Sequence, residues 1–237
     1  MKKIIKIAFV LAFFATTLSS CKKDEEGTIK INYKATVNDQ ELSFYQPYII
    51  NGDTITFELF KFYTSDIKIY DKDDNSAISL GDVHLVNYDD ADSKTQSITV
   101  DATAYKNPTF MIGLSDERNM TDPSSYTSDS PLSLQQGNYW LMASSYIYFK
   151  IEGFRKVNGV NEPMVYHVGF NGMGVEKTAQ KALSVFDEGT TNINFTVDFD
   201  DMFANIDFDT ESTTHTTDNM PLAQKMMDNF VNATTIE

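Results

Sequence analysis

Residues 193–199 read Ile-Asn-Phe-Thr-Val-Asp-Phe, and in this stretch apolar and polar side chains alternate without a break. Alternation with a period of two places the apolar side chains on one face of an extended chain, which predicts a strand with one buried face. The same pattern recurs at 29–34, at 66–70 and at 146–152. The chain is therefore predicted to consist mainly of half-buried strands.

Turn-forming residues separate these runs, at Asn51-Gly52, Asp73-Asp74-Asn75, Asn158-Gly159 and Gly189. Strands do not alternate with helical segments, so a parallel sheet is not expected. Many short strands at this spacing are typical of an antiparallel sandwich or barrel, and we predict an all-β fold built as an antiparallel β-sandwich. The polar segment 115–137 is too long for a hairpin turn, and loops of that length are functional or disordered.

A short C-terminal α-helix is expected to follow the strands. Leu222, Met226 and Phe230 recur at helical spacing, which predicts a helix with one apolar face. Asp218 and Asn219 precede this run and are candidate caps for its first turn.

The first residues of the chain resemble an export signal. They combine three lysines, an apolar run at 7–14 and the sequence Leu18-Ser19-Ser20-Cys21, which ends in the only cysteine of the protein. The run is too short to cross about 30 Å of hydrocarbon. The arrangement resembles a bacterial lipobox, so we expect Cys21 to be lipidated and to anchor the protein in a membrane. The alternative is an ordinary signal peptide with an incidental cysteine.

These features divide the chain into a signal peptide at 1–20, a lipidated cysteine with a charged tether at 21–27, and one β-sandwich domain at 28–237. Lys23-Asp24-Glu25 resembles the acidic tag that sends some bacterial lipoproteins to the outer cell surface, although charge runs of this kind are often only solvated spacers. The expected location is the bacterial cell envelope, as an outer-membrane lipoprotein exposed at the surface.

Charge excludes one class of partner. Without residues 1–20 the chain keeps 16 of its 19 basic residues and all 34 acidic ones, so its net charge changes from −15 to −18 (16 minus 34). Nucleic-acid binding requires clustered Lys and Arg at the phosphates, so no nucleic-acid partner is expected.

The sequence carries no recognisable catalytic motif. It lacks a phosphate-binding glycine loop, a Gly-x-Ser-x-Gly elbow and a His-Glu-x-x-His zinc helix. Its many carboxylates would supply a pair for glycoside hydrolysis only at a suitable separation in space, which a sequence does not give. We therefore predict that the protein is not an enzyme.

Three histidines are the candidate metal ligands. His84 and His167 lie in predicted strands, and His215 precedes the predicted helix. Imidazole suits copper and zinc, and a thioether such as that of Met142 suits reduced copper. Met220, Met226 and Met227 are further soft donors. The alternative for each histidine is a satisfied strand or surface residue, and for the helical methionines core packing.

Several segments, taken in order, resemble the MbnP-like family of secreted copper-binding proteins, named for a methanobactin-associated periplasmic protein. The resemblance covers nearly the whole mature chain. The segments are Lys61-Phe62-Tyr63-Thr64-Ser65-Asp66-Ile67-Lys68, His84-Leu85-Val86, Phe110-Met111-Ile112-Gly113, Gly137-Asn138-Tyr139-Trp140, the strand at 146–153, Tyr166-His167-Val168-Gly169, the strand at 197–203, and His215 with the helix at 223–230.

The resemblance implies copper as the bound metal, for acquisition or storage, and a haem-containing oxidase as a partner. In that family histidine binds copper together with a tryptophan that can be oxidised to kynurenine. Trp140 matches the first tryptophan of the family's Met-(Tyr/Phe)-Trp-x-Trp segment, while Asn138 replaces its methionine and Met142 its second tryptophan. His167, His84, His215 and Met142 are the expected metal ligands. Trp140 is expected to line the site, or else to be a core or loop-anchoring aromatic.

A second function class remains open from the sequence. A surface lipoprotein could bind a glycan or a protein partner without metal, with Tyr139, Tyr146 and Tyr148 as exposed stacking platforms. Convergence of the histidines near Trp140 would favour a metal, and a flat exposed aromatic row would favour a glycan or a protein.

Overall fold

The computed structural model describes residues 25–237. The predicted signal peptide, the lipidation site Cys21 and the Lys23-Asp24 part of the sorting tag lie outside the described residues. The first strand begins at Glu26, within the segment assigned to the tether. No helix in the described part is long and apolar enough to cross a membrane.

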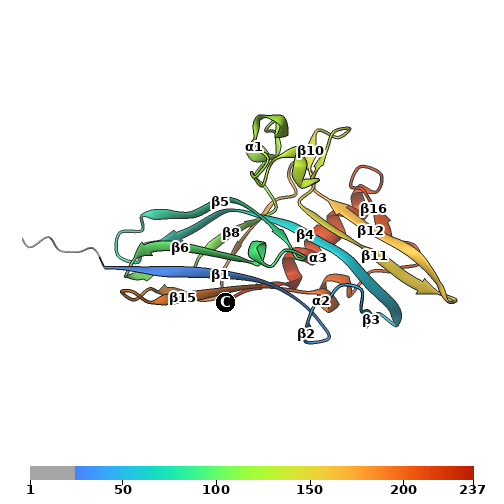
Figure 1. Ribbon diagram of the computed structural model, residues 1–237, viewed down its shortest axis with the longest axis horizontal. Helices are drawn as coiled ribbons and strands as arrows, with labels where there is room; N and C mark the ends of the chain where they lie inside the picture. Colours follow the sequence, from blue (N-terminus) through green and yellow to red (C-terminus); the bar gives the residue numbers. More distant parts are fainter. Residues whose placement is uncertain (1–24) are drawn as a thin grey trace, which may run out of the picture.

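Two β-sheets form the body and confirm the all-β prediction (Figure 1). The five-stranded sheet contains β1 (Glu26–Val37), β2 (Gln40–Glu41), β6 (Thr95–Asp101), β15 (Thr190–Asp198) and β17 (Thr234–Ile236). The eight-stranded sheet contains β3 (Pro47–Ile50), β4 (Asp53–Tyr70), β5 (Ala77–Asn87), β8 (Thr109–Ile112), β11 (Phe149–Val157), β12 (Val160–Val168), β13 (Val175–Thr178) and β16 (Thr213–Thr214).

Smaller elements complete the chain. Two short ribbons pair β9 (Tyr139–Trp140) with β10 (Ser145–Tyr146) and β7 (Ala104–Tyr105) with β14 (Leu183–Ser184). The α-helices are α1 (Asp116–Asn119), α2 (Phe199–Phe203) and α3 (Met220–Ala233), and the 3₁₀ turns are η1 (Asp92–Lys94), η2 (Pro123–Ser125) and η3 (Leu134–Gln136).

Alternation decides which side of each strand is buried. In β15, Ile193, Phe195 and Val197 are fully buried, and the polar residues between them are only partly covered. The prediction from 193–199 is thereby confirmed, except that Phe199 already belongs to α2. Most strand pairs are antiparallel, but β15 pairs with β1 in parallel, with Ile193 opposite Ile31. The paired residues lie about 160 positions apart in the sequence, so local sequence patterns do not predict this pairing.

The C-terminal helix α3 packs its apolar side into the core, as predicted. Phe230 contacts Phe60, Phe62 and Phe149 of the large sheet at ring-centroid distances of 6.2, 5.5 and 4.9 Å. Burying a side chain of this size contributes about 1.5–3 kcal/mol. The cap is Asn219, whose side chain accepts a hydrogen bond from the backbone N–H of Leu222 at 3.2 Å.

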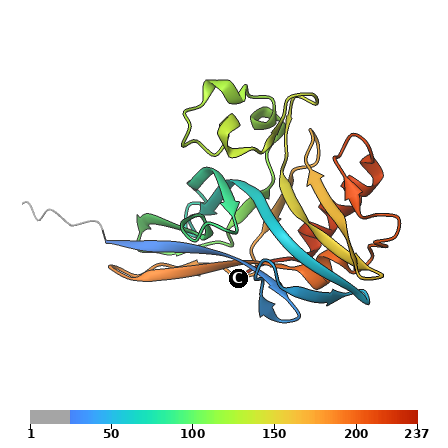
Figure 2. The ribbon, with the colours of Figure 1, turned by 45° about the vertical axis from the view of Figure 1, so that its right-hand side comes forward.

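The long segment 115–137 folds into a lobe above the sheets, carrying α1, η2 and η3 (Figure 2). Buried Asn119 ties this lobe to β10, because its Oδ1 accepts the backbone N–H of Tyr146 at 2.8 Å and its Nδ2 donates to Ser145 Oγ at 3.1 Å. The hydroxyl of Tyr146 in turn donates to the Leu132 carbonyl at 2.9 Å. These bonds fix the β9–β10 hairpin, which carries Trp140.

The buried core of the described residues extends from Ile29 to Ile236. A protein that begins at Glu25 therefore retains both sheets and the entire core between those residues.

Candidate metal site

His167 lies on β12 with its side chain on the outer face of the large sheet. Its Nε2 is 2.7 Å from Oε1 of Glu152 on the neighbouring strand β11. The imidazole is only 14% exposed. Burial lowers the pKa of His167 below its ordinary value, and the hydrogen bond to Glu152 offsets only part of that effect. The ring is therefore neutral near pH 7, the state in which histidine binds metals.

The β11–β12 hairpin sets the position of Glu152 relative to His167. Its turn consists of Asn158 and Gly159, both with positive φ (48° and 82°), which is the two-residue turn that matches the twist of the strands. This turn places Lys150 opposite His167, and Glu152 lies diagonally across from His167 on the same face. Lys150 Nζ is 3.6 Å from Glu152 Oε1, so the carboxylate contacts both a lysine and the imidazole.

His215 approaches from a distant part of the chain. It follows β16, which pairs in parallel with β12 through Thr213 opposite Val165 and Thr214 opposite Tyr166. The buried Thr216 fastens the next turn, since its hydroxyl donates to the His167 carbonyl at 2.8 Å and accepts from the Gly169 N–H at 3.1 Å. The two histidines are thereby held side by side.

Asp218 orients the His215 ring. One carboxylate oxygen accepts from the backbone N–H of His215 at 2.8 Å, and the other lies 3.1 Å from its Nδ1. Burial alone would raise the pKa of Asp218, but the hydrogen bonds from His215 outweigh it and keep the pKa below its usual value. Asp218 is therefore an ionised acceptor at neutral pH.

Three rings from three separate segments meet at this point. The centroids of His167 and His215 are 5.2 Å apart with their planes at 89°. The Trp140 ring lies 5.5 Å from His215 with an interplanar angle of 34°. Convergence of His167, His215 and Trp140 is the geometry that favours a metal over a glycan.

A cavity of about 470 Å³ opens beside the Trp140 and His215 rings, lined by Trp140, Met142, Ala143, His215, Thr217 and Asp218. This volume lies within the range typical of small-ligand sites. The side chain of Met142 is fully exposed at the tip of the β9–β10 hairpin. The cavity therefore offers an imidazole, an indole face and a thioether to one small ligand.

His84 does not join the other two histidines. It lies on β5, which pairs with β4, whereas β16 pairs with β12. Its Nε2 is 2.6 Å from the Ser93 carbonyl, and its ring stacks on Tyr33 at 5.1 Å. His84 thus has the role of a satisfied packing residue.

The other predicted soft donors are divided between core and surface. Met226 and Met227 are fully buried in the core, whereas Met220 is 39% exposed at the start of α3. Within residues 25–237, no group of three or more His, Cys, Asp and Glu side chains has an arrangement that could hold a metal ion. A site built from these four residue types alone is thus limited to two donors among the described residues, and a further donor would come from another residue type, such as the thioether of Met142.

The aromatic row expected for glycan binding is not present in the described part of the chain. Tyr146 and Tyr148 are fully buried, so they offer no stacking face to a sugar, and only Tyr139 is partly exposed. The prediction was wrong because residues 145–149 are all buried, and the alternation of buried and partly exposed residues begins only at Phe149, the first residue of β11.

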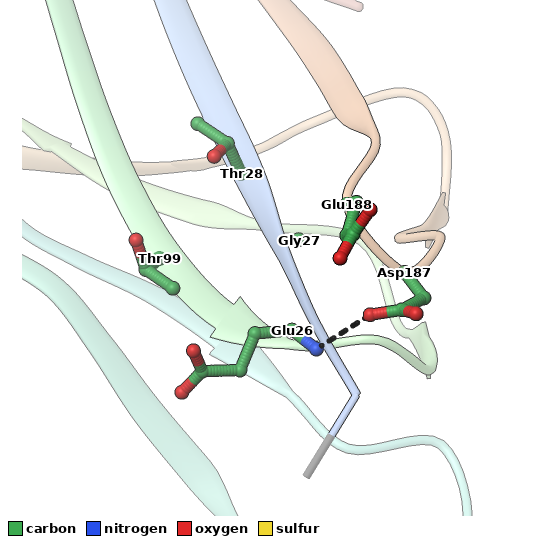
Figure 3. Close-up of a pocket in the computed structure, with 6 residues that line it drawn as sticks. All are labelled: Glu26, Gly27, Thr28, Thr99, Asp187 and Glu188. Carbon is green, nitrogen blue, oxygen red and sulfur yellow. Dashed lines mark hydrogen bonds between the residues drawn. The ribbon is translucent and has the colours of Figure 1, made fainter. Parts of the chain in front are cut away.

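A second cavity, of about 200 Å³, lies where the described chain begins (Figure 3). Its lining residues are Glu26, Gly27, Thr28, Thr99, Asp187 and Glu188. Asp187 accepts a hydrogen bond from the backbone N–H of Glu26 at 3.3 Å. These lining residues include no imidazole or sulfur donor, so this cavity lacks the chemistry expected for copper.

Sequence reasoning missed the roles of two residues in the site. Glu152 was not predicted to contact His167, and Asp218 was not predicted to contact the His215 ring. The register of the Asn158-Gly159 hairpin is the signal that would have placed Glu152 beside His167, because a two-residue turn determines which residues face each other. Asp218 was expected to cap α3, and its side chain instead turns back to His215.

Known proteins that resemble this chain include a protein family and a solved structure. The MbnP family model matches residues 26–220. None of the curated proteins matches the chain. Among solved structures, MbnP from Methylosinus trichosporium matches with a TM-score of 0.53 and 14% sequence identity, covering 77% of this chain and 79% of that one. At that identity the likeness shows a shared fold.

Proposed function

Because the chain belongs to the MbnP family, we propose that it is a copper-binding protein of the bacterial cell envelope, acting in acquisition or storage rather than in catalysis. The observation that carries the proposal is the convergence of the His167 and His215 rings at 5.2 Å, with Trp140 beside them. Copper stands at the top of the divalent affinity series, so even a site with two imidazoles captures it in preference to its competitors.

The spacing of the rings supports a shared ion. A metal–imidazole bond is about 2.0 Å long, so a bound ion lies about 3 Å from the ring centroid. Two rings that share an ion therefore have centroids no more than about 6 Å apart. The measured separation of His167 and His215 falls within that limit.

The remaining donors suit copper better than a hard cation. Met142 lines the same cavity as His215 and carries the thioether that prefers reduced copper. In this proposal Met142, at the position of the family's second tryptophan, is a third ligand. Trp140 is the residue that a haem-containing oxidase partner would convert to kynurenine.

The proposed location follows from the sequence before the described residues. Lipid chains on Cys21 would hold the protein at the outer membrane, where more than one chain gives a stable anchor. The first described strand begins at one end of the molecule, and β16, next to the site, lies toward the other end (Figure 1). An anchor at Cys21 would therefore leave the site facing away from the membrane and open to a partner.

Copper stoichiometry tests the proposal. The protein from Glu25 onward is loaded with Cu(I) or Cu(II), dialysed against a weak chelator and assayed for metal. We expect about one copper per chain, lost in both His167→Ala and His215→Ala. His84→Ala is the control, because it removes an imidazole that lies outside the site, and it should retain the metal. Mass spectrometry of Trp140 after exposure to a haem oxidase then tests the partner.

A wild-type protein that retains no copper in either oxidation state would refute the proposal. Retention of full stoichiometry by both histidine variants would refute the location of the site. Melting curves of each variant show whether loss of copper reflects loss of the fold.

A further inference from the structure

Each imidazole of the proposed site contacts a carboxylate through one of its ring nitrogens. His167 does so through Nε2, 2.7 Å from Glu152, and His215 through Nδ1, 3.1 Å from Asp218. A carboxylate only accepts hydrogen bonds, so the contacted nitrogen is the one that carries the proton. A neutral imidazole has a single N–H, and its other nitrogen then presents a lone pair.

We propose that Glu152 is a positioning residue that fixes His167 as the Nε2–H tautomer and presents its Nδ1 as the metal-binding atom. Asp218 has the opposite effect on His215, because it holds the proton on Nδ1 and leaves Nε2 as the metal-binding atom. The two ligands thus bind through different nitrogens. The inference rests on the proposed function, since the choice of donor atom matters only where a metal binds.

Glu152 is itself held in place, as a positioning residue must be. Lys150 Nζ lies 3.6 Å from its Oε1 and also donates to the Gly137 carbonyl at 3.3 Å. Gly137 belongs to the segment that leads into Trp140. The contacts of Lys150, on β11, therefore link the carboxylate that contacts His167 to the segment that carries the indole.

The chemical reason for such a carboxylate is general. A metal-binding histidine almost always donates its second ring N–H to a carboxylate or carbonyl, which fixes the tautomer and makes the free nitrogen more basic. Loss of that partner typically lowers metal affinity about 10- to 100-fold. A carboxylate that only bridged β11 and β12 would have no effect of this kind.

The first test reads the tautomers without metal. In the protein from Glu25 onward, labelled with ¹⁵N at histidine, NMR distinguishes the protonated ring nitrogen from the one with a lone pair. We expect the proton on Nε2 in His167 and on Nδ1 in His215. Glu152→Gln should remove the preference at His167 alone, because an amide can donate as well as accept. The matched control Glu162→Gln, at the exposed far end of the same hairpin, should change neither.

The second test measures copper affinity by competition with a chelator. We expect Glu152→Gln to bind copper about 10- to 100-fold more weakly than wild type, and Glu162→Gln to bind as wild type does. Equal affinity in Glu152→Gln and wild type would overturn the positioning role, as would an Nδ1–H tautomer at His167 in the wild type.

The two tests separate this inference from the proposed function. A wild-type protein that shows the expected tautomers but binds no copper overturns the proposed function and, with it, the donor assignment. A protein that binds copper with the opposite tautomer at His167 overturns the inference alone.

Discussion

Replacement of Thr216 by valine tests whether one buried hydroxyl holds the two histidines together. The hydroxyl donates to the His167 carbonyl at 2.8 Å and accepts from the Gly169 N–H at 3.1 Å, in a side chain that is 1% exposed. Valine keeps the shape and the β-branch but leaves both backbone groups without this partner. Each unsatisfied buried group costs about 1–3 kcal/mol, so the middle of that range gives about 4 kcal/mol for the pair.

For a domain of this size that loss lowers Tm by about 8–16 °C. Thermal melting and urea unfolding of metal-free protein measure the change, and an unchanged m value shows that the unfolded state is not affected. Thr217→Val is the matched control, since this neighbouring threonine is exposed, and surface changes are usually worth within about 0.5 kcal/mol. If Thr216→Val and Thr217→Val unfold within about 1 kcal/mol of each other, the hydroxyl does not fasten the turn and the reasoning fails.

Three further predictions concern the core, the pH dependence and the third donor. Phe230→Ala should destabilise the fold by about 3–5 kcal/mol in urea unfolding, whereas the exposed Phe186→Ala should change it little, and similar losses would contradict the packing assigned to α3. Burial lowers the pKa of His84 in the folded protein. As the pH falls below about 6.5, the unfolded chain therefore binds a proton at this histidine before the folded chain does, and the free energy of unfolding should decline from pH 7 towards pH 5. A decline of equal slope in His84→Gln would exclude this histidine as a cause. Met142→Ala should weaken copper binding while leaving Tm unchanged, because the side chain is fully exposed, and its exposed neighbour Leu141→Ala should alter neither.

The three histidines show where sequence reasoning ends. His84 and His167 both lie in strands with partly covered side chains, and alternation treats them alike. The two histidines differ in the side chains and backbone groups that contact their rings. The Nε2 of His84 forms a hydrogen bond with the carbonyl of Ser93, in η1, whereas a carboxylate and a second imidazole contact His167. Those partners come from other segments, and no local pattern identifies them.

The fold class could be predicted because it depends on local regularities. A period of two buries one face of each strand, and helical spacing at Leu222, Met226 and Phe230 does the same for α3. The parallel pairing of β1 with β15 could not be predicted, because it joins segments about 160 residues apart. Such a pairing is selected by the total burial of both sheets and not by either strand alone.

The sequence by itself determined one half of the site. The Asn158-Gly159 turn fixes the register of β11 on β12, because only residues that tolerate positive φ complete a two-residue hairpin turn, and that register brings Glu152 diagonally across from His167. The tertiary structure decided the other half. His215 reaches His167 through the pairing of β16 with β12 and the bonds of Thr216. Trp140 reaches His215 because Asn119 and the Tyr146–Leu132 bond hold the β9–β10 hairpin in place. Short-range geometry is fixed by backbone sterics within a turn, whereas contacts between distant segments form only when the whole chain buries its core.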